Sequence, residues 1–378
     1  MKEQVDHLSR LGYKAIYIEP TTDTEAVASG FYNFVFGSPE ILVGDPKWRD
    51  VVRSSELATR LRLIVVDEAH TMIHWGESSG SEDAFREWFS HIGELRSLCV
   101  KMPILALTPT ACPKHRRKIM TKLCFSKNAC IITDSPDRKN IKISVLKIKN
   151  NEDFKNIFSW IITGLCDGSK AFPRHLIFCN SIKDCASLYM FLLQQFAKSD
   201  FFDMFHSKTT ECIKEKIRND MKDEKGVIRI LICTNAAGMG VNFSGVYNVF
   251  HFGPPREIDT YVQQMGRAGR DGVQSQDIII YKPAHLKTLD EDIKKLVTTD
   301  QCRRAVLTNS YMCSEKIDIK KHLCCDLCEK KCSCGEYTCP YVHPAKINLI
   351  NDNSACNDSS SEASSTEDAS DLSDNEID

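Results

Sequence analysis

Short apolar runs alternate with longer amphipathic segments in the first third of the chain. Four runs predict strands: Ala15–Ile18, Phe34–Phe36, Leu63–Val66 and Ile104–Leu107. The third run is continuous and rich in β-branched residues, which is typical of a strand buried on both faces of a parallel sheet. Helices are expected between the strands, including a basic helix from Pro113. This alternation predicts a parallel α/β lobe over residues 1–133.

A second series of strands and helices starts near residue 140. The predicted strands are Leu176–Cys179, Ile228–Cys233 and Val249–Phe252. An amphipathic helix that ends near Phe196 follows the first of them, and another helix starts near Glu257. The pattern predicts a second α/β lobe over residues 134–285, with residues 134–142 as the joint between the lobes.

The composition changes after residue 285. Residues 286–345 are rich in Cys and Lys and predict a small separate module. Residues 346–378 are rich in Ser, Asp and Glu and are expected to be disordered. Four tail serines have an acid three positions on, the pattern that acidophilic kinases such as casein kinase 2 prefer: Ser359, Ser364, Ser365 and Ser373. A kinase of this class is therefore an expected partner of the tail.

Composition and charge narrow the class of protein. With 42% hydrophobic and 26% charged residues the chain reads as an ordinary globular protein. It contains no apolar run near the ~20 residues of a membrane span, and its N-terminus lacks a signal-peptide core. Because the tail is acidic, the rest of the chain is mildly basic, which is compatible with binding a phosphate backbone. Six of the 18 cysteines lie between Cys324 and Cys339, which predicts a metal site rather than disulfides.

Two polar segments carry candidate chemistry. Asp67 and Glu68 follow a predicted strand, where an Asp can hold Mg²⁺ through water and a Glu can deprotonate an attacking water. An ordinary acidic loop is the alternative interpretation. Arg267 and Arg270 lie three apart and would face one way on a helix, where they could place positive charge on a phosphoryl group in transfer. For them the alternative is a basic surface turn, although Gly266 and Gly269 would let backbone approach closely.

Taken in order, the polar segments resemble the motifs of the RecQ family of DNA helicases in superfamily 2. The resemblance covers roughly residues 1–330 and rests on these segments: Ser38-Pro39-Glu40, Asp67-Glu68-Ala69-His70, Thr108-Pro109-Thr110-Ala111, Phe178-Cys179-Asn180-Ser181, Gly238-Met239-Gly240 and Gln263 to Arg270. It implies two RecA-like lobes, the first one incomplete, and an ATP-dependent 3′-to-5′ DNA helicase that uses ATP and Mg²⁺. Such enzymes act in recombination, repair and replication, so the nucleus is the expected location.

The resemblance also implies roles for individual residues. The catalytic set is Asp67, Glu68, Gln263, Arg267 and Arg270. Residues that couple ATP to the motifs are His70, Thr108, Thr110, Gly238 and Gly240. Residues expected to bind single-stranded or junction DNA are Ser38, Trp75, Phe85, Arg86, Asn180 and Thr234. Trp75 would stack on a base, with a core tryptophan as the alternative.

The chain departs from the family pattern in three places. Asn242 stands where the family usually has Asp, and an acidic insert occupies residues 77–84. The phosphate-binding sequence G-x-x-x-x-G-K-[ST] does not occur in the 378 residues. We therefore expect a piece of a longer helicase, or a shortened isoform, whose first lobe has unpaired strand edges. A catalytically inactive nucleic-acid-binding or regulatory protein, built on the second lobe and the cysteine module, is the alternative function.

The cysteine module resembles the zinc-binding segment of RecQ proteins. Cys302-Arg303-Arg304 fits its opening, and Cys325-Asp326-Leu327-Cys328 fits its close. Aligned this way, the resemblance predicts one Zn²⁺ held by Cys302, His322, Cys325 and Cys328, with Cys324 as the alternative to His322. Three further cysteines lie outside the family pattern: Cys332, Cys334 and Cys339. They are either bystander thiols or part of a second site with His343.

Overall fold

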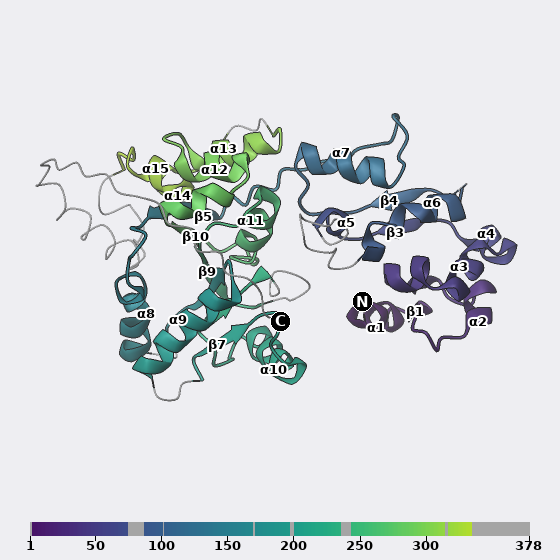
Figure 1. Cartoon of the computed structure of the whole chain (residues 1–378), viewed down its shortest axis with the longest axis horizontal. Coiled ribbons are helices and arrows are strands. Elements are labelled where there is room, and N and C mark those ends of the chain that lie inside the picture. The colour runs from purple at the N-terminus through teal and green to yellow at the C-terminus, as the bar shows by residue number, and fades with distance from the viewer. Residues whose placement is uncertain are drawn as a thin grey trace, which may run out of the picture.

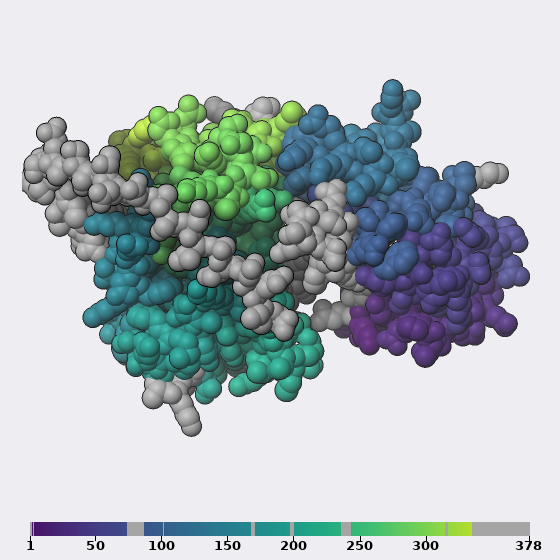
Figure 2. All heavy atoms as spheres, in the orientation of Figure 1, coloured from purple at the N-terminus to yellow at the C-terminus, as the bar shows by residue number. Residues whose placement is uncertain are grey.

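The computed structural model describes residues 2–74, 87–100, 102–168, 171–196, 200–235, 243–313 and 317–334. Figure 1 shows two parts, an N-terminal part coloured purple to blue and a larger part coloured teal to yellow-green. Their surfaces meet where the blue and green segments adjoin (Figure 2). In the described chain, the helices are all too short or too polar to cross a membrane.

The N-terminal part contains two pairs of parallel strands. The pairs are β1 (Ala15–Tyr17) with β2 (Phe34–Phe36), and β3 (Ile64–Val66) with β4 (Ile104–Ala106). Its helices are α1 (Lys2–Arg10), α2 (Thr24–Ala28), α3 (Pro46–Arg53), α4 (Ser55–Arg60), α5 (Thr71–His74), α6 (Leu95–Leu98) and α7 (Pro113–Lys122). Local sequence explains where helices begin: the Asp45 side chain accepts from Lys47 N at the start of α3, and Pro46 occupies the first turn. The predicted strands and the basic helix from Pro113 are all present.

One prediction for this part is wrong. The run Leu63–Val66 was expected to be buried on both faces, but Val65 is 48% exposed whereas Val66 is only 7% exposed. The buried face packs on one cluster that includes Ala69, Met72 and Ile119. The opposite face, with Leu63 and its neighbours on β4, stays exposed among the described residues. β3 therefore shows the alternation of a strand that is covered on one side only.

The second part is built on one six-stranded parallel sheet. The strand order is β5-β10-β9-β6-β8-β7. The strands are β5 (Ile141–Lys147), β6 (Arg174–Cys179), β7 (Phe202–Phe205), β8 (Ile230–Cys233), β9 (Val246–Phe252) and β10 (Ser275–Tyr281). The helices are α8 (Phe154–Gly168), α9 (Ile182–Gln195), α10 (Glu211–Lys222), α11 (Ile258–Met265), α12 (Glu291–Thr298), α13 (Arg303–Ser310), α14 (Lys321–Cys324) and α15 (Asp326–Glu329).

Both faces of this sheet are buried. Leu176 and Phe178 on β6 belong to one apolar cluster, and Ile177 between them belongs to another on the opposite face. This is the arrangement expected when crossover helices cover both sides of a parallel sheet. Together with the parallel pairs of the N-terminal part, it confirms the predicted α/β class.

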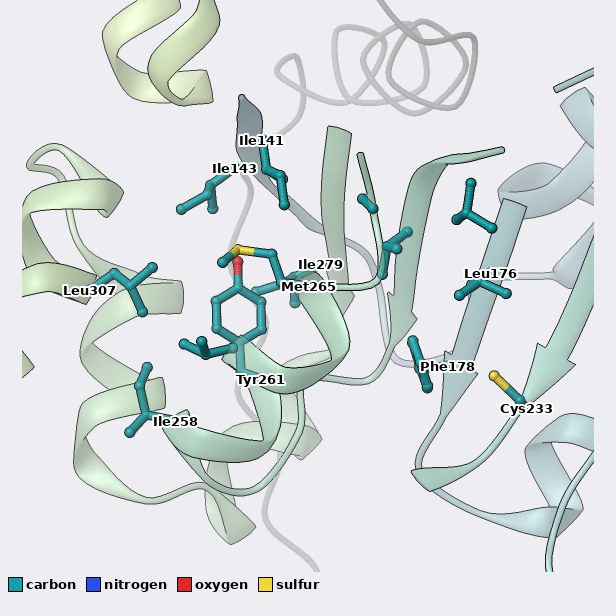
Figure 3. Packing of buried hydrophobic residues seen from close by; sticks show 14 of the residues in the cluster. Ile141, Ile143, Leu176, Phe178, Cys233, Ile258, Tyr261, Met265, Ile279 and Leu307 are labelled. Carbon is teal, nitrogen blue, oxygen red and sulfur yellow. The ribbon is translucent and has the colours of Figure 1, made fainter. Parts of the chain in front are cut away.

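The cysteine-rich segment packs on the second sheet. Figure 3 shows Tyr261 and Met265 of α11 among residues of the sheet, with Leu307 of α13 close by. α14 and α15 rest on β5, where Cys325 forms a backbone bridge with Ile143. The described part of the module thus shares the apolar core of the second part.

Candidate active site

Three of the predicted site residues lie in the neighbouring loops at the ends of β3 and β4. Asp67 and Glu68 come directly after β3, and Thr108 follows β4. The backbone holds these loops together, because Leu107 N donates to Val66 O at 2.9 Å and Ala69 N donates to Leu107 O at 2.9 Å. The carboxyl ends of parallel strands are where α/β proteins commonly place ligands.

His70 connects the two loops. Its Nδ1 lies 3.1 Å from Thr108 Oγ1 and 3.3 Å from Glu68 Oε2. Thr108 Oγ1 in turn donates to the backbone oxygen of Thr110 at 2.8 Å. The structure therefore brings together three of the predicted coupling residues, and the imidazole is buried between them. These contacts link the Glu68 carboxylate to the loop after β4.

The environment of Glu68 suits a proton acceptor. Burial raises the pKa of its carboxyl, the neighbouring charge of Asp67 raises it further, and the positive charge of Arg267 opposes the shift. A carboxylate with a raised pKa is a stronger base. The backbone of Glu68 has φ = 50°, a conformation that non-glycine residues rarely adopt and that is often found at functional sites.

The two predicted arginines differ in their surroundings. α11 ends at Met265, so both lie in the following loop, and the expectation that one helix face presents them together is wrong. Arg267 is only 6% exposed, whereas Arg270 is exposed. Burial lowers the pKa of Arg267 to about 10, helped by Arg270 and opposed by Cys233 and Glu68. The Arg267 guanidinium therefore remains positive at neutral pH, and it interacts with a carboxylate of the other lobe.

Gly269 fixes the shape of this loop. Its φ is +52°, and a Cβ at this position would overlap Asn140 Nδ2 and Ser275 Oγ. Its backbone oxygen accepts from Arg138 Nη2 at 2.7 Å and from Asn140 Nδ2 at 2.9 Å. The predicted close approach of backbone at a glycine is present here, and it ties the arginine loop to the joint between the lobes.

The structure also shows a buried polar network that the sequence analysis did not single out. Gln264 donates to Asn235 Oδ1, and its Oε1 lies 2.9 Å from His251 Nδ1. His251 Nε2 lies 2.7 Å from Asp277 Oδ1, and Asp277 also accepts from Tyr261 at 2.7 Å. Polar residues inside the apolar strands β9 and β10 were the available signal. The predicted Gln263 directly precedes Gln264 and is half-buried.

The predicted DNA-binding residues are only partly described. Ser38, Asn180 and Thr234 follow the carboxyl ends of β2, β6 and β8, respectively, where side chains can face a ligand. Their contact with nucleic acid remains a prediction. The other predicted residues of this kind, and two motif glycines, lie outside the described residues: Trp75, Phe85, Arg86, Gly238 and Gly240.

A cluster of four sulfurs lies at the start of α13 and around α14. Its members are Cys302, Cys324, Cys325 and Cys328, whose Sγ atoms all lie within 4.8 Å of one another. Cys328 N donates to Cys325 Sγ at 3.4 Å. Hydrogen bonds from the Cys302 thiol, and next from the Cys324 thiol, lower the pKa of Cys325. None of the described cysteines forms a disulfide. Four converging sulfurs, one of them stabilised as thiolate, fit the ligand set of a tetrahedral structural zinc.

This cluster favours the alternative ligand, Cys324, over the predicted His322. On α14, His322 and Cys324 are two positions apart and so face opposite sides of the helix. Cys324 faces Cys302 at an Sγ–Sγ distance of 3.6 Å. Cys324 and Cys325 are adjacent in the sequence, but Cys325 is extended (φ −156°, ψ 168°) between two helices, and this break lets both sulfurs converge.

Comparison with known proteins identifies similar helicases. The profile of the helicase conserved C-terminal domain matches residues 158–272. The chain is 29% identical over 331 residues to the ATP-dependent helicase wrn-1 of Caenorhabditis elegans, covering 84% of this chain and 29% of that protein. It is 26% identical over 337 residues to the ATP-dependent DNA helicase RecQ of Haemophilus influenzae, covering 82% of this chain and 50% of that protein. The chain thus spans half or less of the length of these relatives.

Solved structures show the same fold. The helicase Lhr of Mycobacterium smegmatis, bound to single-stranded DNA and AMP-PNP, superposes with a TM-score of 0.52 at 16% identity, covering 80% of this chain and 39% of that chain. At that identity the likeness concerns the fold alone. The similarity in sequence to RecQ-type helicases, however, extends over 82–84% of the chain. Over most of its length, the chain is accordingly similar to RecQ-type helicases.

Proposed function

We propose that this chain forms part of the motor of an ATP-dependent 3′-to-5′ DNA helicase. The observation that carries the proposal is the position of Glu68 directly after β3, in contact with His70. The buried Arg267 of the other lobe is near enough for its charge and that of Glu68 to act on each other's pKa. A general base and a buried arginine on either side of one junction are the parts that phosphoryl transfer to water requires. The relatives named DNA helicases support DNA as the substrate.

Each residue at the junction has a defined task in this proposal. Bound ATP with Mg²⁺ would supply the phosphoryl group and neutralise its charge, with Asp67 as the residue that holds the metal. Glu68 would accept the proton of the attacking water. Arg267 would place positive charge beside the phosphoryl oxygens without having to move from water into a buried site. His70, in contact with Glu68 and Thr108, would couple protonation of the Glu68 carboxylate to the loop after β4.

Zinc would have a structural role. Cys302, Cys324, Cys325 and Cys328 would hold one Zn²⁺. Such an ion would cross-link the start of α13 to α14 and α15 and so fix the module on β5, because the described residues of the module pack into the core of the second lobe. Location in the nucleus and a role in recombination, repair or replication are part of the same proposal.

One observation favours the alternative, a nucleic-acid-binding protein without catalysis. The 378 residues contain no G-x-x-x-x-G-K-[ST] sequence, which cradles the phosphates in P-loop enzymes. ATP hydrolysis should therefore be measured with and without DNA, both for the chain itself and for the chain preceded by the P-loop segment of a RecQ relative. Strand separation should be compared on duplexes with 3′ and 5′ tails.

The outcomes separate the two functions. DNA-stimulated hydrolysis by the extended chain that is lost in Glu68→Gln, with unwinding from a 3′ tail, supports the helicase. Tight binding of single-stranded DNA with no hydrolysis in either form supports the non-catalytic alternative. ATP hydrolysis that is stimulated by RNA but not by DNA would show that the substrate is RNA rather than DNA.

A further inference from the structure

A second group of metal-ligating side chains lies on the other side of α14 from the four-sulfur cluster. It consists of His322, Cys332 and Cys334, whose ligand atoms lie within 4.8 Å of one another. His322 Nδ1 lies 3.0 Å from Cys334 Sγ and 3.4 Å from Cys332 Sγ, and the two sulfurs are 2.9 Å apart. One imidazole nitrogen and two thiols therefore point at a common position.

The fold brings these three residues together by a tight return of the chain. After α15, Lys331 N donates to Cys328 O at 3.0 Å and Cys332 N donates to Glu329 O at 2.9 Å. This turn carries the C-x-C segment back over α14, where His322 is only 6% exposed. His322 faces away from the four-sulfur cluster because it lies two positions before Cys324.

We propose that His322, Cys332 and Cys334 bind a second zinc ion, distinct from the ion of the four-sulfur cluster. Imidazole and thiolate are the ligands that Zn²⁺ takes in proteins, and hard cations such as Mg²⁺ or Ca²⁺ avoid sulfur. Around a tetrahedral Zn²⁺ the sulfurs would sit about 3.8 Å apart, so the thiols need to separate by less than ~1 Å to admit the ion. The two thiols would release their protons on binding.

The strongest competing chemistry is a disulfide between Cys332 and Cys334. Their sulfurs are 2.9 Å apart, well beyond the bond length of about 2.05 Å, and the imidazole nitrogen within reach of both has no part in a disulfide. Simple hydrogen bonding among the three groups is the other alternative. Both alternatives predict a chain that holds one zinc rather than two.

Two ions on opposite sides of α14 would have a structural consequence. α14 has only four residues and cannot be stable alone. The four-sulfur cluster would fix its Cys324 side to α13 and α15, and the second ion would fix its His322 side to residues 332–334. This site does not depend on DNA unwinding, so it can be tested even if the proposed function fails.

Metal content is the direct test. The purified full chain should contain two zinc ions by elemental analysis, and the double variant Cys332→Ser/Cys334→Ser should contain one. His322→Ala should also lose one ion. Cys212→Ser is the matched control, because this exposed thiol of α10 lies outside both clusters, and it should retain two. One zinc in the unaltered chain, or two in the double variant, would overturn the proposal.

A measurement on the unaltered protein covers the case in which the variants do not fold. After exchange with cadmium, ¹¹³Cd NMR should show two resonances, one at the low-field position of a four-sulfur shell and one at higher field from the mixed shell. A single resonance would refute the second site. So would a Cys332–Cys334 linkage found by mass spectrometry of protein that was alkylated without reduction.

Discussion

His115 Nδ1 lies 2.5 Å from Asp259 Oδ2 and joins the two lobes through a buried ion pair. His115 belongs to α7 of the first lobe, and Asp259 belongs to α11, the helix that leads into the arginine loop. Asp259 also accepts from Cys112 N at 3.2 Å and from the Tyr311 hydroxyl at 2.5 Å. One carboxylate therefore connects the first lobe, the second lobe and the module that follows it.

This ion pair makes the stability of the lobe junction depend on pH. The hydrogen bond to Asp259, and next that to Cys112, raises the pKa of His115 from 6.5 to about 10, against the effect of burial. Burial opposes ionisation of Asp259, but hydrogen bonds from His115 and Tyr311 outweigh it and lower its pKa. Because the raised pKa belongs to the folded state, the contribution of His115 is complete below about pH 6.5 and is lost as the pH rises towards about 10.

We therefore expect His115→Gln to destabilise the protein most near pH 6 and least near pH 10. The loss at pH 6 should be about 3–5 kcal/mol, the usual effect of breaking a buried pair. Chemical unfolding of both proteins across this pH range measures the difference. His7→Gln, at an exposed position on α1, is the control and should change little at any pH. A difference that stays constant from pH 6 to 10 would show that the pair is not ionised as described.

Glu68 is expected to limit ATP turnover. In a form of the protein that hydrolyses ATP, Glu68→Gln should lower the rate by several orders of magnitude and leave ATP binding nearly unchanged, because only proton transfer is lost. Glu56→Gln, at an exposed carboxylate on α4, serves as the control. Steady-state hydrolysis and equilibrium binding of a nucleotide analogue are the measurements. Turnover within threefold of the parent would remove Glu68 from the role of base.

The charge of Arg267 should lower the pH below which ATP turnover is lost. Its charge lowers the pKa of Glu68, which burial and Asp67 otherwise raise. Glu68 must be ionised to accept a proton, so the rate falls as the pH drops through its pKa. Residual turnover in Arg267→Ala should therefore begin to fall at a higher pH than in Arg267→Lys, which keeps the charge. If turnover fell at the same pH in both variants, the interaction across the junction would be contradicted.

Local patterns predicted much of the fold because their signals lie close together in the sequence. Apolar runs located β1 to β4, β6, β8 and β9, each within a few residues, and the contact of His70 with Thr108 follows from the ends of neighbouring strands. β5, β7 and β10 were not predicted. β5 and β10 interrupt apolar runs with buried polar residues: Lys142 pairs with Glu329 of α15, and Asp277 accepts from Tyr261 of α11.

Long-range contacts could not be read from the sequence. His115 and Asp259 are 144 positions apart, and nothing near either residue indicates the other. Alignment to the family spacing favoured His322 as the ligand. In the structure, the four-residue helix α14 directs His322 and Cys324 to opposite sides, and this direction could not be read from the spacing. Likewise, Arg267 is buried and Arg270 is exposed because the helix ends at Met265, before both of them. The glycines at 266 and 269 did not indicate where the helix ends.

Arg304 should be essential for attaching the cysteine module. Its buried guanidinium donates to Asp137 Oδ1, to Arg138 O at 3.0 Å and to Ile141 O. A lysine cannot reach these acceptors together, so Arg304→Lys should cost about 3–5 kcal/mol and make zinc easier to extract. Arg256→Lys, at an exposed arginine, is the control. Chelator-induced zinc release followed by a colorimetric dye gives the measurement, and equal release from both variants would contradict this role.

The last prediction identifies the fourth ligand of the first zinc. In the double variant Cys332→Ser/Cys334→Ser the remaining ion should have four sulfur neighbours at about 2.3 Å by X-ray absorption, because Cys324 faces Cys302 and His322 faces away. Adding Cys324→Ser to this variant should release that ion and unfold the module, whereas adding His322→Ala should leave it bound. A shell of three sulfurs and one nitrogen, with zinc lost on adding His322→Ala, would restore the histidine that the family spacing predicted.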